Sequence, residues 1–220
     1  MIRTSIYLLL VVAFVSAISV RAAVAQTSWE PRSLVVSDRV PRPTAKWEMA
    51  TAANVAGLTI ILEQTKLEEV AERFGAALGS SGVVPDRLQW VCLVAAGGQS
   101  PWIAWFLVTD LDREGVVSGF QLRQLGSEER VDSRCGLVPD AASLLIAPSD
   151  VRLGMTRADA LERLGRPDTI VGEVAEYVHE HSKWASLERL QQVRTANGLV
   201  VRFRQGVIDA IEVWKSTGHV

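Results

Sequence analysis

Two segments of the chain place apolar residues at helical spacing and then reach a glycine. In the first, Leu67 to Phe74, apolar residues recur at i, i+3, i+4 and i+7, which predicts an amphipathic helix. Thr65 to Glu68 has the sequence of a capping box, which places the start of this helix. Gly75 or Gly79 is expected to stop it, because glycine readily takes the left-handed conformation that ends helices.

The second helical segment, Thr156 to Gly165, has clearer boundaries. Thr156 is the predicted cap, and Asp159 stands at the capping-box position. Gly165 ends the helix and Pro167 prevents its continuation. The predicted inner face of this helix comprises Ala158, Leu161 and Leu164.

Apolar runs bounded by turn residues predict strands after each helix. The predicted strands are 90–94, 102–108 and 116–125 in the first half, and 170–178, 191–195, 199–204 and 207–214 in the second. Asn197-Gly198 favours a two-residue hairpin turn between two of them. Residues 186–193 keep a second interpretation as a short helix, because Leu187 and Leu190 stand at helical spacing.

A short pattern occurs twice in the chain at nearly one offset. Glu72–Gly75 returns as Glu162–Gly165 after 90 positions, and Gly115–Leu122 returns as Gly206–Val213 after 91. We therefore expect an α+β fold of two tandem helix-plus-antiparallel-sheet repeats, with the helices packed on one face of the sheet. The predicted organisation is a signal peptide at 1–25, an extended lead-in at 26–50, a first repeat at 51–125, a linker at 126–147 and a second repeat at 148–216.

Strand alternation divides the predicted sheet into two faces. The side chains assigned to the buried face are Leu199, Val201, Phe203, Val207, Ile211 and Val213, with Phe120 and Leu122 from the first repeat. The opposite, open face would carry Trp214, Arg202, Arg204, Glu212, Arg123 and Gln121. Tryptophan and arginine are enriched in protein-binding patches, so these six residues form the candidate binding site. The alternative is an ordinary solvated face whose arginines and glutamate pair across strands.

The first residues have the pattern of an export signal. Arg3 supplies the positive charge, residues 6–20 form an apolar core of 15 residues, and Ala23-Val24-Ala25 is a cleavage site ahead of Gln26. Cleavage after Ala25 predicts a periplasmic or secreted protein. An uncleaved anchor is the alternative, but a spanning helix needs about 20 apolar residues. No later segment is long and apolar enough to span a membrane, so no span is expected after cleavage.

The polar lead-in that follows the signal keeps two interpretations open. Trp29 and Trp47 could dock it onto the body of the protein, or it could be a disordered tail. The whole chain carries 23 basic residues against 25 acidic ones and has no basic stripe, which argues against nucleic acid as a partner. In an exported chain Cys92 and Cys135 are expected to form one disulfide; two free thiols or a metal pair are the alternatives.

The segment Leu153 to Asp168, with G-M-T, a helix and then L-G-x-P-D, precedes a meander that closes in F-x-x-G-V-I-x-x-I. This pattern resembles the β-lactamase-inhibitor-protein-like repeat, a unit shared with the small outer-membrane assembly lipoproteins of Gram-negative bacteria. The resemblance covers residues 149–215 and, more weakly, 65–125. It implies a tandem pair with a concave protein-binding surface and export from the cytoplasm. It implies no contact residues, because its motif consists of capping and turn residues.

The sequence holds no evident catalytic constellation, cofactor motif or metal site. His179 and His181 share a strand face but lack further ligands, and Asp110, Asp112 and Glu114 begin a calcium loop that Gln121 fails to close. We therefore expect a non-enzymatic module that binds another exported or envelope protein through the open sheet face. A structural or small-ligand envelope module, with a pocket near Trp102 or Trp184, is the alternative. The oligomeric state is left open.

Overall fold

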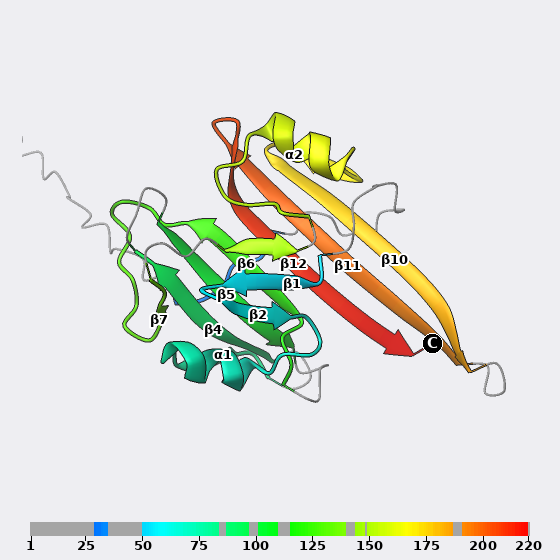
Figure 1. The fold of residues 1–220 in the computed structure, drawn as a ribbon, viewed down its shortest axis with the longest axis horizontal. Helices are drawn as coiled ribbons and strands as arrows, with labels where there is room; N and C mark the ends of the chain where they lie inside the picture. Colours follow the sequence, from blue (N-terminus) through cyan, green and yellow to red (C-terminus); the bar gives the residue numbers. More distant parts are fainter. Residues whose placement is uncertain are drawn as a thin grey trace, which may run out of the picture.

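The structure is a computed structural model of the chain and describes residues 29–34, 50–83, 87–96, 101–109, 115–139, 144–147, 149–186 and 191–219. Within these residues short strands and one helix come first, and a second helix then precedes three long strands (Figure 1). In chain order the elements are β1 (Ala52–Val55), β2 (Leu58–Ile61), α1 (Leu67–Phe74), β3 (Leu78–Ser81), β4 (Leu88–Ala95), β5 (Trp102–Thr109), β6 (Gly119–Gln124), β7 (Gly136–Leu137), β8 (Leu145–Ala147), α2 (Arg157–Leu164), β9 (Thr169–Val171), β10 (Val174–Ser186), β11 (Gln191–Arg204) and β12 (Val207–His219).

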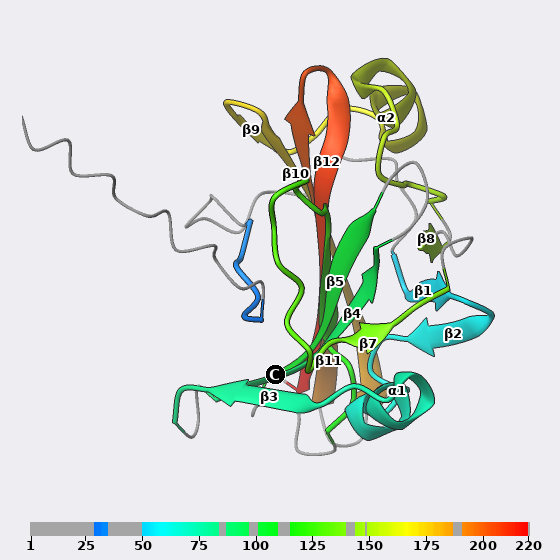
Figure 2. The same ribbon diagram turned by 90° about the vertical axis from the view of Figure 1, so that its left-hand side faces the viewer.

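One large sheet runs through the described part of the molecule in the order β3-β4-β5-β6-β12-β11-β10-β9, with antiparallel neighbours throughout. At one edge, β7 adds to β4 in parallel. A smaller sheet of β2, β1 and β8 lies on the side of the large sheet that also carries both helices, whereas residues 29–34 lie on the opposite side (Figure 2). The large sheet therefore has two differently covered faces.

The prediction of an α+β fold built from two tandem helix-plus-sheet repeats is wrong. In the described residues each helix has only 8 residues, whereas β10, β11 and β12 have 13, 14 and 13. The fold is therefore mainly β. Pairing of β6 with β12 joins the strands of both halves into one sheet. Helical periodicity shows that a helix forms, but it does not show how much of the chain the strands take up. Neither described helix is long and apolar enough to cross a membrane.

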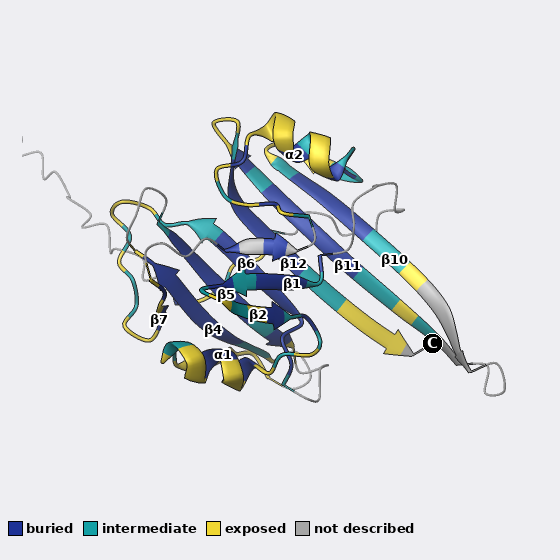
Figure 3. Ribbon diagram, viewed as in Figure 1, coloured by how far each residue is buried: buried dark blue, intermediate teal, exposed yellow. Residues whose placement is uncertain are grey.

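The main core lies between the large sheet and the side that carries the helices. Figure 3 shows buried residues along the central strands, with exposed residues on the outward sides of both helices and near the end of β12. The alternation predicted for this face is confirmed at Leu199, Val201, Phe203, Phe120, Leu122, Ile211 and Val213, all of which belong to this core. Residues of α1 and α2 contribute to the same cluster, so both halves of the chain share one core.

One backbone joint recurs at the offset of the sequence repeat. Lys66 forms an isolated antiparallel bridge with Val116, and Thr156 forms the equivalent bridge with Val207. In each case the amide of the next residue donates to the carbonyl of a glycine. The Leu67 amide donates to Gly115 O at 3.0 Å, and the Arg157 amide donates to Gly206 O at 2.9 Å. The repeated pattern thus specifies how each helix entrance attaches to a later strand.

The capping box predicted for α1 is wrong, although its predicted end is correct. The Thr65 hydroxyl accepts a hydrogen bond from the Ile61 amide at 2.9 Å, so it closes the turn before the helix. The helix begins after Lys66, whose side chain makes no capping bond. Gly75 terminates α1 with a φ of 60°, and Gly165 terminates α2 with a φ of 76°.

For α2 the predicted cap is confirmed and the predicted inner face is wrong in one position. The Thr156 hydroxyl accepts from the Asp159 amide at 3.2 Å and donates to its carboxylate at 2.8 Å. Ala160 and Leu164 are the buried residues of the helix, whereas Ala158 is exposed. The helix is therefore rotated so that a narrower apolar stripe faces the core.

The sequence predicted a turn at Asn197-Gly198, and this prediction is wrong. The two residues lie inside the continuous strand β11. A Cβ at Gly198 would lie 2.1 Å from the indole of Trp214 on β12, so the ring occupies the space that a side chain would take. The side-chain amide of the buried Asn197 donates to Ala50 O at 3.0 Å and to Trp214 O at 2.8 Å. Tertiary contacts thus explain both residues in a strand that local propensity disfavours.

The hairpin between β11 and β12 instead turns at Gln205-Gly206. Both residues have positive φ values, 54° and 80°, as a type I′ turn requires. The alternative of a short helix at 186–193 is wrong for residues 191–193, which belong to β11. Residues 187–190 lie outside the described part of the chain.

A bulge in β12 overturns one further prediction. The register with β11 shifts between Arg202 and Phe203, which leaves Asp209 as an extra residue on β12. Ile208 consequently enters the core, and Val207, which was predicted to be buried there, turns to the opposite face. The bulge also aims Asp209 at a neighbouring side chain of β11, as described below.

We predict that Gly79→Ala destabilises the protein. A Cβ at Gly79 would lie 2.3 Å from the indole of Trp90, which is buried and has no room to move aside. Overpacking of this kind lowers the free energy of unfolding by about 1–3 kcal/mol, which urea denaturation would measure. The matched control is Gly218→Ala, because a Cβ there meets no atom within 4 Å. Equal effects of the two substitutions would contradict the tight packing between Gly79 and Trp90.

Candidate functional site

The six candidate residues lie on the sheet face opposite the helices, which we call the outer face. Cross-strand pairing connects Gln121 on β6 to Glu212 on β12, and Glu212 in turn to Val200 on β11. Val200 pairs with Glu176 on β10, so a row of mostly polar residues crosses the sheet. The neighbouring rows hold the other four candidates, Trp214, Arg123, Arg202 and Arg204.

Residues 29–34, which we call the strap, cover the part of this row formed by Gln121 and Glu212. The strap main chain is held by sheet side chains: the Trp105 indole donates to Trp29 O at 3.0 Å, and the Arg32 amide donates to Gln121 Oε1 at 2.9 Å. The Leu34 amide donates to Glu212 Oε2 at 2.5 Å. Because amides 32 and 34 point the same way, the strap is extended there.

The expectation of an open face is therefore wrong at its centre. Gln121 and Glu212 are each only 6% exposed, although alternation placed them correctly on the outer face. The Ser33 hydroxyl adds a third contact, donating to Glu212 at 3.1 Å. Sequence alternation tells which face a strand residue points to, but it does not tell what a distant segment lays over that face.

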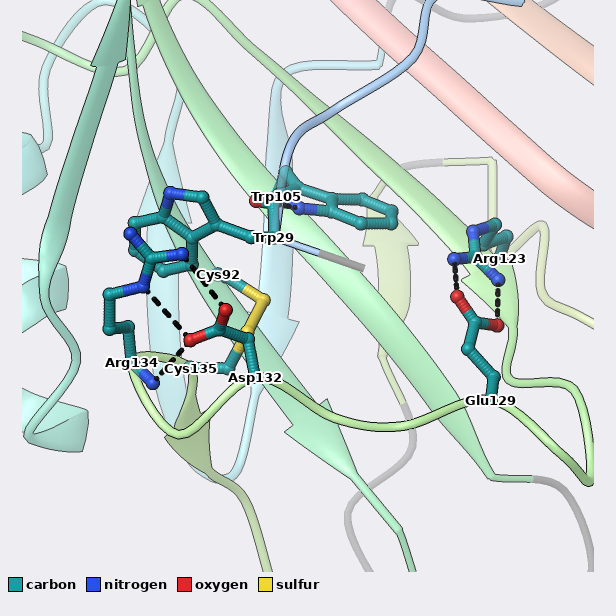
Figure 4. Close-up of a disulfide and its surroundings, with 8 residues drawn as sticks. All are labelled: Trp29, Cys92, Trp105, Arg123, Glu129, Asp132, Arg134 and Cys135. Atoms are coloured by element: carbon teal, nitrogen blue, oxygen red, sulfur yellow. Dashed lines mark hydrogen bonds and ion pairs between the residues drawn. A yellow bond between two sulfur atoms is a disulfide. The ribbon is translucent and has the colours of Figure 1, made fainter. Parts of the chain in front are cut away.

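Trp29 anchors the strap on the first half of the sheet. Its side chain is 8% exposed and packs edge-on against Trp90, with the ring centroids 5.8 Å apart. The Arg134 guanidinium lies over the Trp29 ring at 3.9 Å, and Asp132 orients that guanidinium through hydrogen bonds of 2.9 Å (Figure 4). The hydrogen bonds from Arg134 also lower the pKa of Asp132 to about 2.

Docking of the lead-in is thus confirmed for the residues of the strap. The other tryptophan predicted to dock it, Trp47, lies outside the described residues. Within the strap only Trp29 is buried, whereas Glu30, Arg32 and Ser33 are exposed. Attachment of the strap therefore depends on one aromatic side chain and on hydrogen bonds to main-chain groups.

The predicted disulfide between Cys92 and Cys135 is confirmed and lies under this anchor. Both cysteines belong to a small apolar cluster on the outer side of the sheet that includes Trp29 and Trp105 (Figure 4). Trp90 belongs to the same cluster. The bond joins residues 43 positions apart, and closing such a loop stabilises a fold by about 4 kcal/mol on the chain-entropy model. A buried structural disulfide fits a chain that folds in an oxidising compartment.

Two of the candidate arginines have partners within the protein. Arg123 forms a forked ion pair with Glu129 and lies over the Trp105 ring at 5.3 Å, and it lowers the pKa of Glu129 (Figure 4). Arg202 forms two hydrogen bonds of 2.8 Å with Asp209, the residue that the bulge adds. The solvated-face alternative expected the arginines to pair across strands with Glu212. Arg202 does pair across strands, but its partner is Asp209.

One uncovered part of the outer face lies where β9, β10, β11 and β12 meet near the β11–β12 hairpin. It consists of Val171, Val174, Arg202, Arg204 and Val207, which we call the open margin. Val171 is 51% exposed and Arg204 is exposed, so this margin carries both apolar and cationic surface. Trp214 does not belong to this margin, because its ring is half-buried over Gly198.

Glu212 is a buried carboxylate of the site whose pKa lies above its ordinary value. Burial raises the pKa of Glu212, and the buried Glu176 carboxylate adds to the increase. Hydrogen bonds from Leu34, Ser33 and Gln121 oppose it by favouring the charged form. The strap therefore contacts a carboxylate for which the cost of losing water exceeds the gain from its new partners.

The other sequence candidates do not form a second site. His179 and His181 share a face of β10, and the described residues contain no group of three His, Cys, Asp or Glu that could hold a metal. The acidic residues 110–114 lie outside the described part. Trp102 belongs to the main core, and nothing is described of the Trp184 side chain, so no pocket is supported at either.

Two surface hollows lie away from the outer-face row. One of about 620 Å³ surrounds the start of α2, with Arg152 and Arg163 at its rim. Another of about 450 Å³ lies beside Cys135 and Leu137. In the first hollow the Thr156 hydroxyl and the Asp159 carboxylate are engaged in capping α2.

Comparison with known proteins returns no match to a protein-family model, to a curated protein or to a solved structure. The site therefore has to be interpreted from its own geometry. The sequence offered Trp29 as a docking residue in one of two interpretations of the lead-in. It gave no sign of the Asp132–Arg134 support, and the Asp209 bulge had only the nearby Gln205-Gly206 turn as a signal.

We predict that Glu212→Gln changes how stability depends on pH. Because the pKa of Glu212 is raised in the folded protein, the folded chain binds more protons than the unfolded chain just above the ordinary glutamate range. Stability of the native protein therefore falls as pH rises through that window, and the variant lacks this component. The unfolding free energy of the variant minus that of the native protein should increase between pH 4 and pH 7 in urea titrations. A decrease would show that the strap hydrogen bonds outweigh burial.

Proposed function

We propose that this chain is an exported, non-enzymatic protein-binding module that acts in the cell envelope through its outer face. The N-terminal sequence supports export, with cleavage after Ala25 and release into the periplasm or the medium. The disulfide fits the same route, because exported proteins fold where disulfides persist. Its partner is then another exported or envelope protein.

The observation that carries this proposal is the seating of the strap on the outer face. Side chains of β5, β6 and β12 hold an extended segment by its main-chain amides and one carbonyl. Recognition of main-chain groups is how sheets and grooves bind extended peptides of varied sequence. The open margin continues this face with two exposed features of protein interfaces, apolar surface and arginine.

The sequence resemblance of residues 149–215 points in the same direction. The β-lactamase-inhibitor-protein-like repeat implies a protein-binding surface on a sheet, and this remains an expectation from the motif. The proposal differs from it in placing binding on named residues of this chain, at the open margin and along the row that contains Glu212.

We predict that a photoreactive phenylalanine analogue at position 204 captures a specific partner in cells that express the protein. Arg204 is exposed on the open margin, so a probe there reaches any protein docked on the outer face. The control carries the same probe at Arg163, which is exposed on α2 on the opposite side of the sheet. A discrete adduct at position 204 alone is expected on gel electrophoresis and mass spectrometry. Equal adducts at both positions, or none at position 204, would refute the proposed surface.

A further inference from the structure

We propose that the strap is an intramolecular ligand and that the outer face binds a partner's extended segment of the same chemistry in its place. The inference rests on the proposed function and names what the outer face recognises. The occupant is an extended polypeptide with an aromatic residue at its first position and free main-chain amides three and five residues later.

The contacts of the strap define this chemistry. The aromatic position corresponds to Trp29, whose ring lies between Trp90 and the Arg134 guanidinium. The two amides correspond to Arg32 and Leu34, which donate to Gln121 and Glu212. A proline at either position would remove the donor that the sheet side chains receive.

The strap makes little use of its own side chains beyond the aromatic anchor. Glu30 and Arg32 are exposed and act on Arg134 and Glu129 through charge attraction. The hydroxyl of Ser33, also exposed, contacts both carboxylate oxygens of Glu212. A segment held mainly through its main chain can be replaced by another segment with a different sequence. Trp90, Trp105, Gln121 and Glu212, which hold it, belong to strands of the sheet, and Arg134 lies in a loop that the neighbouring disulfide at Cys135 ties to β4. These residues therefore stay in place when the strap leaves.

The acceptors on the sheet also favour an occupied face. Glu212 and Gln121 lie side by side on adjacent strands, and both accept strap amides. A carboxylate that is covered by protein needs donors, because an unpaired buried charge is costly. Any segment that covers this row must therefore supply amide or hydroxyl donors at the two positions, which an extended backbone does at every second residue.

The covalent connection of the strap sets the strength that a competitor needs. The strap belongs to the same chain as its site, with 15 residues between Leu34 and Ala50. A covalently connected ligand has an effective concentration on the order of millimolar at its own site. A free peptide of the same sequence is therefore expected to bind weakly to the native protein and much more tightly to a chain whose own strap is impaired.

The test uses the full chain and a labelled synthetic peptide that spans residues 27–36. The peptide is titrated by fluorescence anisotropy into the native chain and into the Trp29→Ala chain. We expect the Trp29→Ala chain to bind the peptide at least about tenfold more tightly than the native chain, because its own strap no longer competes well. The peptide carrying Trp29→Ala should bind neither chain.

Two peptide controls separate main-chain recognition from general stickiness. A peptide with Leu34→Pro loses the main-chain N–H that donates to Glu212, whereas a peptide with Glu30→Ala keeps every main-chain donor and loses an exposed side chain that acts on Arg134 through charge attraction. Binding should fall at least about tenfold for the first and by much less for the second. Equal binding of both peptides would overturn the proposed recognition chemistry.

A second chain keeps the test decisive if Trp29→Ala impairs folding. The chain with Leu34→Pro keeps the Trp29 anchor but weakens strap attachment, and circular dichroism shows whether it is folded. A folded chain of either kind that fails to bind the native peptide would overturn the proposal and leave the strap as a fixed part of the fold. This outcome is independent of the cross-link at position 204, so the two ideas can fail separately.

Discussion

The pairing of β6 with β12 is the interaction on which the rest of the structure depends. Five cross-strand pairs, from Gly119 with Trp214 to Arg123 with Ala210, join the sheet of the first half of the chain to that of the second. The approach is close: a Cβ on Gly119 would lie 2.7 Å from Val213 O. This seam places residues of distant sequence next to each other on both faces, so the core and the outer face each extend across the whole molecule.

The strap makes use of the seam directly. Its anchor, Trp29, lies on the first half of the sheet, whereas its last amide is bound by Glu212 from the second half. Gln121 and Glu212 come from opposite sides of the seam and accept amides two residues apart. Binding of this segment therefore requires that the two halves of the sheet are correctly aligned. Loss of the seam would separate the two acceptors and remove the site without altering any residue that contacts the strap.

Sequence reasoning predicted the local features whose cause is local. Thr156 caps α2, Gly75 ends α1, and strand alternation placed Leu199 and its neighbours in the core, because each depends on backbone sterics or on a period of two. It failed where a distant residue decided the outcome. Gly198 is needed because the Trp214 indole lies over it, so a dipeptide that favours a turn continues a strand.

The candidate site shows the same division. All six residues were assigned correctly to one face, since alternation needs only the strand itself, but their exposure was not predicted. The strap covers Gln121 and Glu212. Asp209 on β12 binds Arg202, and Glu129 in the loop after β6 binds Arg123. These partners are separated from the candidates in sequence or displaced by a bulge, so no short pattern records them. Only Arg204 remains as the exposed residue that the alternation described.

The buried glutamate explains why such a face holds a strap at all. Gln121, Glu212 and Glu176 lie in one row of the outer face, and the apolar side chains of a covering sheet or helix would leave these polar groups without hydrogen-bond partners. An extended segment fits it, because its main chain supplies donors while its side chains point to solvent. The aromatic cluster around Cys92 then supplies the apolar contact that the row lacks. Affinity and orientation therefore come from different parts of the sheet. The first half binds the aromatic anchor, and Gln121 and Glu212 at the seam orient the segment by accepting its main-chain amides.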